Sequence, residues 1–359
     1  MQRAKKIGKP ILQIGLPLII LAIIIIYIRR DWNQLTSYTF EWNPALLALA
    51  FGGFLLQELS YGLIWRSVLA RLGSRLDLRI SLRIYLASEF VRYIPGNVWH
   101  VLTRVLWVSK YGVPRPIAFA SMMVELITKL AAGVFVFAVS LLFWGNLGSV
   151  RSLLYGTPIV VALGVLTILA LLIVLHPRIL GALLNTALRL LKRNPVVLSL
   201  RYSDILFVTL AWCASWLIAG AAFYVLLLAL WPHAPLIALP ICIGIYAIAW
   251  DVGFVSFITP SGLGFREGAI TGLFLLALPL PGALAAIIAV LSRLVSTLAE
   301  LVCVSIAYLS GGGQARAIQH EQEAISQFHE QDHAGKEDAA LLSTDAPEHL
   351  NVEEGVIGD

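Results

Sequence analysis

Charged side chains stand inside stretches of this sequence that are otherwise apolar. Six of them are in or beside such stretches: Glu58, Glu125, Lys129, Asp251, Arg293 and Glu300. Near the centre of a membrane helix each charge costs about 2.5–3.5 kcal/mol on insertion scales, so these groups must face one another or water. Two interpretations remain open. Glu125–Lys129 and Arg293–Glu300 are pairs that only hold helices together, or the charges line a polar path for a charged substrate.

Two elements that break apolar sequence occur twice, in register. Residues 95–97 read Pro-Gly-Asn and 114–116 read Pro-Arg-Pro. Residues 260–262 read Pro-Ser-Gly and 279–281 read Pro-Leu-Pro. The prolines of the first pair of segments and those of the second are separated by 165 residues at all three matched positions. Paired interruptions of this kind are typical of transporters whose substrate site lies between two repeats. The alternative is a chance alignment of two Pro-kinked membrane helices, because such helices use Gly and Pro freely.

The loop that begins at Pro260 has the chemistry of an anion site. Its glycines leave backbone N–H groups open, and a helix beginning near Phe265 would direct its positive end at the loop, with Arg266 in its first turn. Glu267 either caps that helix or pairs with Arg293 or Lys129. Phosphate is the anion that suits such a cradle.

The first broken element has a similar setting, with Arg92 before it and His100 and Arg104 after it. The residues predicted to bind a lipid phosphate are Arg92, Pro95, Gly96, Asn97, Arg104, Ser261, Gly262, Gly264 and Arg266. The residues predicted to line an intramembrane polar path are Glu58, Glu125, Lys129, Asp251, Glu267, Arg293 and Glu300.

The composition places the chain in a bilayer. Of its 359 residues 59% are hydrophobic and 13% charged, and the apolar runs are far longer than barrel strands, so we expect an all-α polytopic membrane protein. The segment 311–359 has eleven acidic residues against two basic ones, a net −9, so the remainder of a chain of net charge +5 carries +14. No Lys/Arg-rich stretch interleaves with exposed aromatic residues, so no nucleic-acid partner is expected.

No set of residues has the spacing of a catalytic centre. There is no hydrolase triad order, metalloprotease motif, phosphate-binding P-loop or acidic metal site in the sequence. Cys213, Cys242 and Cys303 lie in apolar stretches without the spacing of metal ligands. We therefore expect no catalytic residues, no metal and no cofactor.

Hydropathy predicts six full spans, near 11–28, 44–70, 116–144, 157–176, 203–231 and 281–309. Two broken or re-entrant helical hairpins are expected at about 80–111 and 236–278, and the alternative for the second is a full span at 236–259. Basic residues gather in loops that place the N-terminus and the C-terminal tail in the cytoplasm, with the protein in the cell membrane. In that orientation the halves 44–144 and 203–309 of a domain 1–310 form an inverted repeat.

Two segments lie outside these halves. Residues 178–193 place apolar side chains on one helical face, flanked by Arg178, Arg189, Lys192 and Arg193, so we expect a linker helix in the cytoplasmic interface. Residues 311–359 are acidic and poor in aromatic residues, which predicts a largely disordered tail.

Two motifs connect these features to a known family. Residues 90–99, Phe-Val-Arg-Tyr-Ile-Pro-Gly-Asn-Val-Trp, resemble the first signature of the lysylphosphatidylglycerol synthase transmembrane family, also called flippase-like membrane proteins. Residues 260–269, Pro-Ser-Gly-Leu-Gly-Phe-Arg-Glu-Gly-Ala, resemble its second and more specific signature. Ser261 replaces a glycine of the usual Pro-Gly-Gly-Leu-Gly loop. The resemblance covers about residues 10 to 310.

The resemblance implies an inner-membrane protein that moves a lipid with a charged or bulky head group between leaflets. Multiple peptide resistance factors move aminoacylated phosphatidylglycerol, and other relatives are linked to lipid-linked sugars. The family's motif residues fall on Arg92, Pro95, Gly96, Pro260, Gly262, Gly264, Arg266 and Glu267. The sequence resembles only the membrane part of the synthases, so we expect lipid aminoacylation to need another protein.

Three hypotheses follow. The leading one is translocation of an anionic or head-group-modified lipid, either an aminoacyl-phospholipid or a lipid-linked sugar. The second is a non-transporting membrane scaffold for a lipid-modifying enzyme or a glycosyltransferase. The third is an intramembrane lipid transferase with Glu125, Asp251 or Glu267 as its base.

Overall fold

The computed structural model describes residues 43–89, 99–144, 166–167, 169–190, 200–256 and 260–309. The chain divides into two units, 1–308 and 309–359, and Leu309 alone is described in the second. The predicted span 11–28, half of the predicted span 157–176 and the predicted disordered tail therefore lie outside the described residues.

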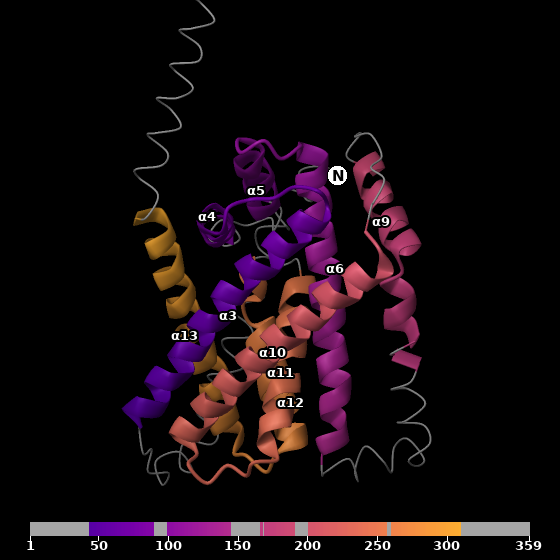
Figure 1. The fold of residues 1–359 in the computed structure, drawn as a ribbon. Coiled ribbons are helices and arrows are strands. Elements are labelled where there is room, and N and C mark those ends of the chain that lie inside the picture. Colours follow the sequence, from indigo (N-terminus) through magenta and orange to yellow (C-terminus); the bar gives the residue numbers. More distant parts are fainter. Residues whose placement is uncertain are drawn as a thin grey trace, which may run out of the picture. The chain divides into compact units, whose positions relative to one another are not determined.

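The described residues are helical and contain no strand (Figure 1). The elements, in chain order, are α3 (Pro44–Arg71), α4 (Leu78–Glu89), α5 (Trp99–Ser109), α6 (Arg115–Ser140), η2 (Leu141–Phe143), α9 (Pro177–Leu190), α10 (Tyr202–Leu230), α11 (Ala238–Val255), η3 (Pro260–Gly262), α12 (Phe265–Ala277) and α13 (Gly282–Leu309).

Local capping sets several helix ends. The side chain of Asn43 accepts hydrogen bonds from the backbone N–H groups of Ala45 and Leu46, at 3.1 and 3.2 Å, where α3 begins with a proline. Asp204 accepts from the N–H of Arg201 at 3.0 Å at the start of α10. These caps satisfy backbone donors that a helix terminus leaves without a partner.

Among the described residues, five helical segments are long and apolar enough to cross a membrane. They are Pro44–Arg71, Arg115–Phe143, Tyr202–Leu230, Ala238–Val255 and Gly282–Ala307. Four of them match the spans predicted at 44–70, 116–144, 203–231 and 281–309. The fifth, α11, has the length and composition of a span, as in the alternative for 236–259. The protein is a multi-pass, all-α membrane protein.

α10 lies at the centre of the packing, against α3, α6 and α11, and Figure 1 shows α3 running alongside it. Trp212, Trp216 and Phe223 on α10 are fully buried. The rings of Phe223 and Tyr246 join α10 to α11 with centroids 5.2 Å apart, and Phe54 joins α3 to the same tyrosine at 5.5 Å. Aromatic packing therefore binds the two halves of the chain together.

Glycines let these helices approach closely. A Cβ atom added to Gly53 on α3 would lie 2.6 Å from the Cβ of Ala222 on α10. Gly220 on α10 faces Ile243 on α11, and Gly244 on α11 faces Ser140 on α6, in the same way. Small residues at helix crossings are typical of membrane proteins, where van der Waals contact takes over the role of the hydrophobic effect.

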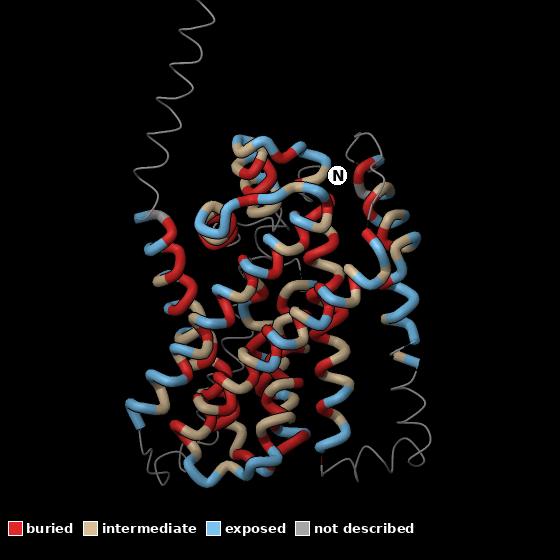
Figure 2. Tube along the Cα trace, viewed as in Figure 1, coloured by how far each residue is buried: buried red, intermediate tan, exposed pale blue. Residues whose placement is uncertain are grey.

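The outer surface carries the apolar side chains that lipid requires. Leu49, Leu56 and Leu63 on α3 are exposed at a spacing of seven residues, while other residues of that helix are buried. Figure 2 shows the same alternation of exposed and buried positions along α10. Such a stripe of exposed leucine side chains is unfavourable in water, whereas it is favourable in the hydrocarbon core of a membrane.

α9 covers most of the predicted linker helix 178–193. Leu180, Leu184 and Leu188 are buried on one face, four residues apart, whereas Leu183 is exposed. The helix is therefore present, and its position at a cytoplasmic membrane interface stays a prediction.

Replacing Gly53 with Val tests the close approach of α3 and α10. The added side chain has no room beside Ala222, so we expect a loss of about 1–3 kcal/mol in the free energy of unfolding. Gly52→Val is the matched control, because a Cβ at Gly52 has nothing within 4 Å. Thermal unfolding of both variants in detergent measures the difference. Equal melting temperatures for the two variants would contradict this packing.

Candidate functional site

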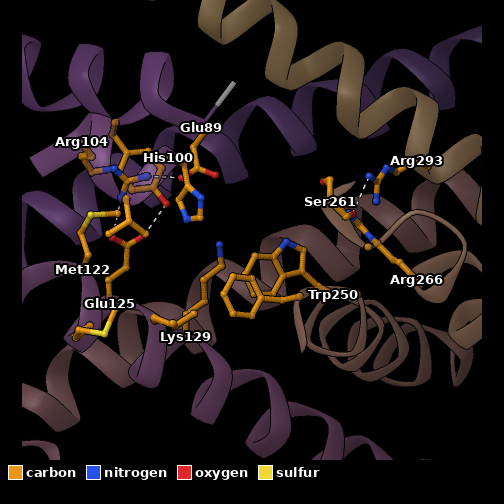
Figure 3. A pocket seen from close by; sticks show the side chains of 17 residues that line it. Glu89, His100, Arg104, Met122, Glu125, Lys129, Trp250, Ser261, Arg266 and Arg293 are labelled. Atoms are coloured by element: carbon orange, nitrogen blue, oxygen red, sulfur yellow. Dashed lines mark hydrogen bonds and ion pairs between the residues drawn. The ribbon is translucent and has the colours of Figure 1, made fainter. Parts of the chain in front are cut away.

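A cavity of about 270 Å³ lies among α4, α5, α6, α11, η3, α12 and α13. Figure 3 shows Arg104 and Glu125 at one end and Ser261, Arg266 and Arg293 at the other, with Lys129 and Trp250 between them. The wall therefore combines residues of both halves of the chain. Its charged residues are Arg104, Lys129, Arg266 and Arg293 against Glu89 and Glu125. The lining carries more positive than negative groups.

Arg104 on α5 organises the first end of the cavity. Its side chain is 1% exposed, and its Nη1 donates to Glu125 Oε2 on α6 at 2.8 Å. Its Nη2 donates to Glu89 on α4, and its Nε donates to Ser88 Oγ at 2.8 Å. Three helices are therefore joined by one guanidinium group, whose rigid fork suits several acceptors at once.

Tyr85 completes this network. Its hydroxyl donates to Glu125 Oε1 at 2.8 Å, so both oxygens of that carboxylate have a donor. Its ring lies under Arg104, with the guanidinium carbon 3.9 Å from the ring centroid, and Trp65 faces the same carbon at 5.4 Å. A buried ion pair is stable only when its remaining hydrogen-bonding positions are filled, and here they are extensively filled.

Lys129 on α6 lies in a box of aromatic rings, which we call the aromatic box. Its ammonium nitrogen is 3.6 Å from the ring centroid of Tyr61, 3.9 Å from Trp250, 4.9 Å from Trp212 and 5.8 Å from Trp216. Each ring face attracts a cation by about 0.5–2 kcal/mol, more when both are away from water. The rings come from α3, α10 and α11, so one charge draws three helices towards α6.

Asp251 on α11 meets α6 one turn beyond Lys129. A Cβ atom on Gly133 would lie 2.8 Å from the carboxyl carbon of Asp251, so the missing side chain makes the space that the carboxyl group occupies. Asp251 is 5% exposed, and among the described residues neither of its oxygens has a hydrogen-bond partner. Its electrostatic interaction is with Lys129.

The loop between α11 and α12 has backbone conformations that favour glycine. Ser261, Gly262 and Gly264 have φ values of 52°, 65° and 85°. A Cβ atom on Gly262 would lie 2.6 Å from the carbonyl carbon of Gly253 on α11, so the loop lies directly on that helix. Ser261, which stands where a glycine is usual, adopts the left-handed conformation all the same.

Two residues hold this loop in place. Glu267, in the first turn of α12, accepts a hydrogen bond from the N–H of Gly264 at 2.6 Å. Its other oxygen lies 3.6 Å from Nη1 of Arg293 on α13, and Nη2 of Arg293 donates to the carbonyl oxygen of Ser261 at 3.0 Å. Glu267 therefore has two of the roles predicted from the sequence: it caps α12 and it pairs with Arg293.

Arg266 differs from the other arginines of the cavity. It is 7% exposed, its guanidinium carbon lies 4.6 Å from the ring centroid of Tyr246, and it lines the cavity. Among the described residues its Nε and Nη2 have no hydrogen-bond partner. A buried guanidinium group with unused donors has a strong affinity for an anion.

A second, smaller cavity of about 10 Å³ lies on the far side of Trp250, Arg266 and Arg293, which line both cavities. Glu58 on α3 and Glu300 on α13 line the smaller one. These two carboxyl groups therefore lie apart from Arg104 and Glu125.

The structure brings seven of the sixteen predicted residues together at the larger cavity. Arg104, Ser261, Gly262 and Arg266 line the larger cavity with Glu125, Lys129 and Arg293. The sequence allowed pairs Glu125–Lys129 and Arg293–Glu300, whereas the structure pairs Glu125 with Arg104 and Arg293 with Glu267. Arg92, Pro95, Gly96 and Asn97 lie outside the described residues, so their part in phosphate binding stays a prediction.

Sequence reasoning missed the partners of the predicted charges. Tyr85, Ser88 and Glu89 bind Arg104 or Glu125, and Tyr61, Trp212, Trp216 and Trp250 surround Lys129. Glu89 had a usable signal, since it is an acidic residue in an apolar stretch. Trp212 and Trp216 also had one, since a spacing of four residues places them on one face of a helix.

A comparison with known protein families identifies the family of this chain. The model of one family, described as the lysylphosphatidylglycerol synthase TM region, matches residues 13–303. The chain belongs to this family. The match covers most of the 359 residues and includes all the elements that line the two cavities. A search of curated proteins finds no match.

Replacing Arg104 with Met tests the network at the first end of the cavity. Glu89 and Glu125 would lose their shared cation in a buried place, so we expect the free energy of unfolding to fall by about 3–5 kcal/mol. Denaturation by SDS in mixed micelles measures this change in the free energy of unfolding.

Arg71→Met is the matched control for that change. Arg71 pairs with Asp204 at 3.4 Å near the surface, where a pair is worth about 0–1 kcal/mol. If the two variants lost the same stability, the Arg104 network would not be a main support of the fold.

Proposed function

We propose that the protein moves a phosphate-bearing lipid between the leaflets of the cell membrane and that the larger cavity receives the head group. The observation that carries this proposal is Arg266, a buried residue of the cavity wall whose guanidinium Nε and Nη2 have no hydrogen-bond partner among the described residues. Four cations line the cavity against Glu89 and Glu125, with Glu267 beside Arg293, and an anionic ligand would balance the remaining positive charge. Membership of a lipid-related membrane family supports lipid as the substrate class.

The open backbone of the loop adds to this site. With positive φ at Ser261, Gly262 and Gly264, the chain turns tightly before α12, and the first turn of that helix carries the positive end of its dipole. Glu267 and Arg293 hold the loop against α13. The phosphate group would therefore lie between Arg266 and Arg293, and the lipid is anionic or carries a modified head group, such as an aminoacyl-phospholipid or a lipid-linked sugar.

We also propose that the two halves form an inverted repeat around this cavity. The described helices follow the same order in each half, with α3, α4, α5 and α6 corresponding to α10, α11, α12 and α13. α5 and α12 each begin within four to five residues of their Pro-Gly or Pro-Ser-Gly element. In this arrangement α4 and α5 form one re-entrant hairpin, since neither is long enough to span, and α11 and α12 form the other, in which α11 enters the membrane and returns through α12 although its length would allow it to cross; the cavity opens alternately to each side.

The basic residues support the orientation proposed for this repeat. Arg66, Arg75 and Arg79 are exposed at the end of α3 and the beginning of α4, and Lys110 is exposed after α5. The positive-inside rule places these positions in the cytoplasm, together with the N-terminus and the C-terminal tail. With both termini in the cytoplasm, the protein could receive a lipid from an enzyme that modifies the lipid head group on that side of the membrane.

Lipid movement in proteoliposomes tests the proposal. Fluorescent anionic phospholipids, including an aminoacylated phosphatidylglycerol, report how fast lipid of the inner leaflet becomes accessible to an impermeant quencher. We expect the parent to accelerate movement and Arg266→Ala to slow it about tenfold or more, since a charged hydrogen bond is worth about 1.5–3 kcal/mol.

Arg79→Ala is the control for that experiment, because Arg79 is exposed and outside the cavity. It should move lipid at the parent's rate. If Arg266→Ala moved lipid as fast as the parent, the site would be wrong. If the parent moved none of the lipids, the scaffold hypothesis would be favoured, and altered lipid in the product would favour the transferase hypothesis.

A further inference from the structure

The contact between α6 and α11 places a buried acid beside a buried base at the centre of the molecule. Asp251 lies against the backbone of α6 at Gly133, and Lys129 is one helical turn away on the same helix. Gly133 and Lys129 are four residues apart, so they share one face of α6. Asp251 and Lys129 therefore belong to one helix–helix contact, which joins the first half of the chain to the second.

The two groups are solvated very differently. The ammonium group of Lys129 lies between the rings of Tyr61 and Trp250, at 3.6 and 3.9 Å from their centroids. Asp251 is more than nine-tenths buried, and its two oxygens have no hydrogen-bond donor among the described residues. An ionised carboxylate without donors is very unfavourable in an apolar interior, whereas a neutral carboxylic acid is far less so.

The surroundings of Asp251 leave Lys129 as its electrostatic partner. The elements packed against α11 are α6, α10, α12, η2 and η3. The other ionisable groups within the membrane part of these elements are Glu125 on α6, Cys213 and Tyr224 on α10, and Arg266 and Glu267 on α12. Glu125 is held by Arg104 and Tyr85, and Glu267 is held by Gly264 and Arg293.

We propose that Asp251 is a proton-binding site and that its proton controls the position of Lys129. While the carboxyl group is neutral, the ammonium group stays in the aromatic box. When the O–H bond of the acid breaks, the proton passes to water of the larger cavity, whose wall includes the neighbouring residues Trp250 and Gly253. The new carboxylate then attracts the ammonium group out of the aromatic box, because a charge pair in a low dielectric is stronger than a cation–π contact.

Movement of Lys129 would change the site itself. Lys129 and Trp250 both line the larger cavity, and Trp250 also lines the smaller one. Loss of the proton at Asp251 would therefore alter the charge and shape of the wall between the two cavities. This inference rests on the proposed lipid movement, and it names protons as the ligand that couples to that movement.

Chemical labelling tests the proton site without any measurement of lipid movement. A hydrophobic carbodiimide reacts with a protonated carboxyl group in an apolar place, where the acid adds across the C=N bond and rearranges to a stable N-acylurea. We expect mass spectrometry of the parent protein to find this adduct on Asp251 at low pH, with less adduct as the pH rises. Asp251→Asn should carry no adduct at this position. An Asp251 that stays unlabelled at every pH would overturn the proposal.

The pH dependence of lipid movement tests the coupling. In proteoliposomes the rate of the parent should change by up to about tenfold per pH unit on the limb where one proton is bound or released. Asp251→Asn should move lipid at a rate independent of pH over that range. Asp77→Asn is the matched control on an exposed aspartate, and its profile should follow that of the parent.

The outcomes separate the two proposals. A pH profile of Asp251→Asn identical to that of the parent would overturn the proton site while leaving lipid movement intact. If no sample moved lipid, the proposed function would fail, and the labelling experiment would then decide alone whether Asp251 binds a proton.

Discussion

Charge in an apolar interior is the constraint on which this structure depends. Each buried ion needs compensation from opposite charge, hydrogen bonds or ring faces, because hydrocarbon supplies none. α6 carries much of that compensation. Glu125 accepts from Arg104 and Tyr85, Lys129 lies in the aromatic box, and Gly133 makes room for Asp251. A helix of modest amphipathicity thereby contacts α4, α5, α10 and α11 through charges as well as through packing.

The two ends of the larger cavity satisfy their arginines to different degrees. Arg104 has protein acceptors for Nε, Nη1 and Nη2, so this end is suited to holding three helices in place. Arg266 keeps donors without acceptors among the described residues, so this end is suited to binding. Arg293 lies between these extremes, since a backbone carbonyl and a carboxylate share it. The same residue type therefore has its donors filled by the protein at one end and keeps unfilled donors, among the described residues, at the other.

Local sequence patterns could predict the long helices, the loop before α12 and its first turn at Phe265, because each depends on neighbours along the chain. Glu267 was placed correctly for the same reason, as its cap spans three residues. The aromatic box could not be predicted, since Tyr61, Lys129, Trp212 and Trp250 come from four helices. Arg104 was predicted as a phosphate ligand, and its acceptors Glu89 and Glu125 depend on how α4, α5 and α6 pack.

The wall that Arg266 and Arg293 form between the two cavities has a consequence for any anion that travels through it. Arg266 and Arg293 line both cavities, and a guanidinium group is planar with donors that point in several directions. A phosphate that moved from one cavity to the other would leave one edge of a guanidinium group and bind the other edge of the same group. Such an exchange would need only side-chain rotation, which is much faster than the movement of a helix.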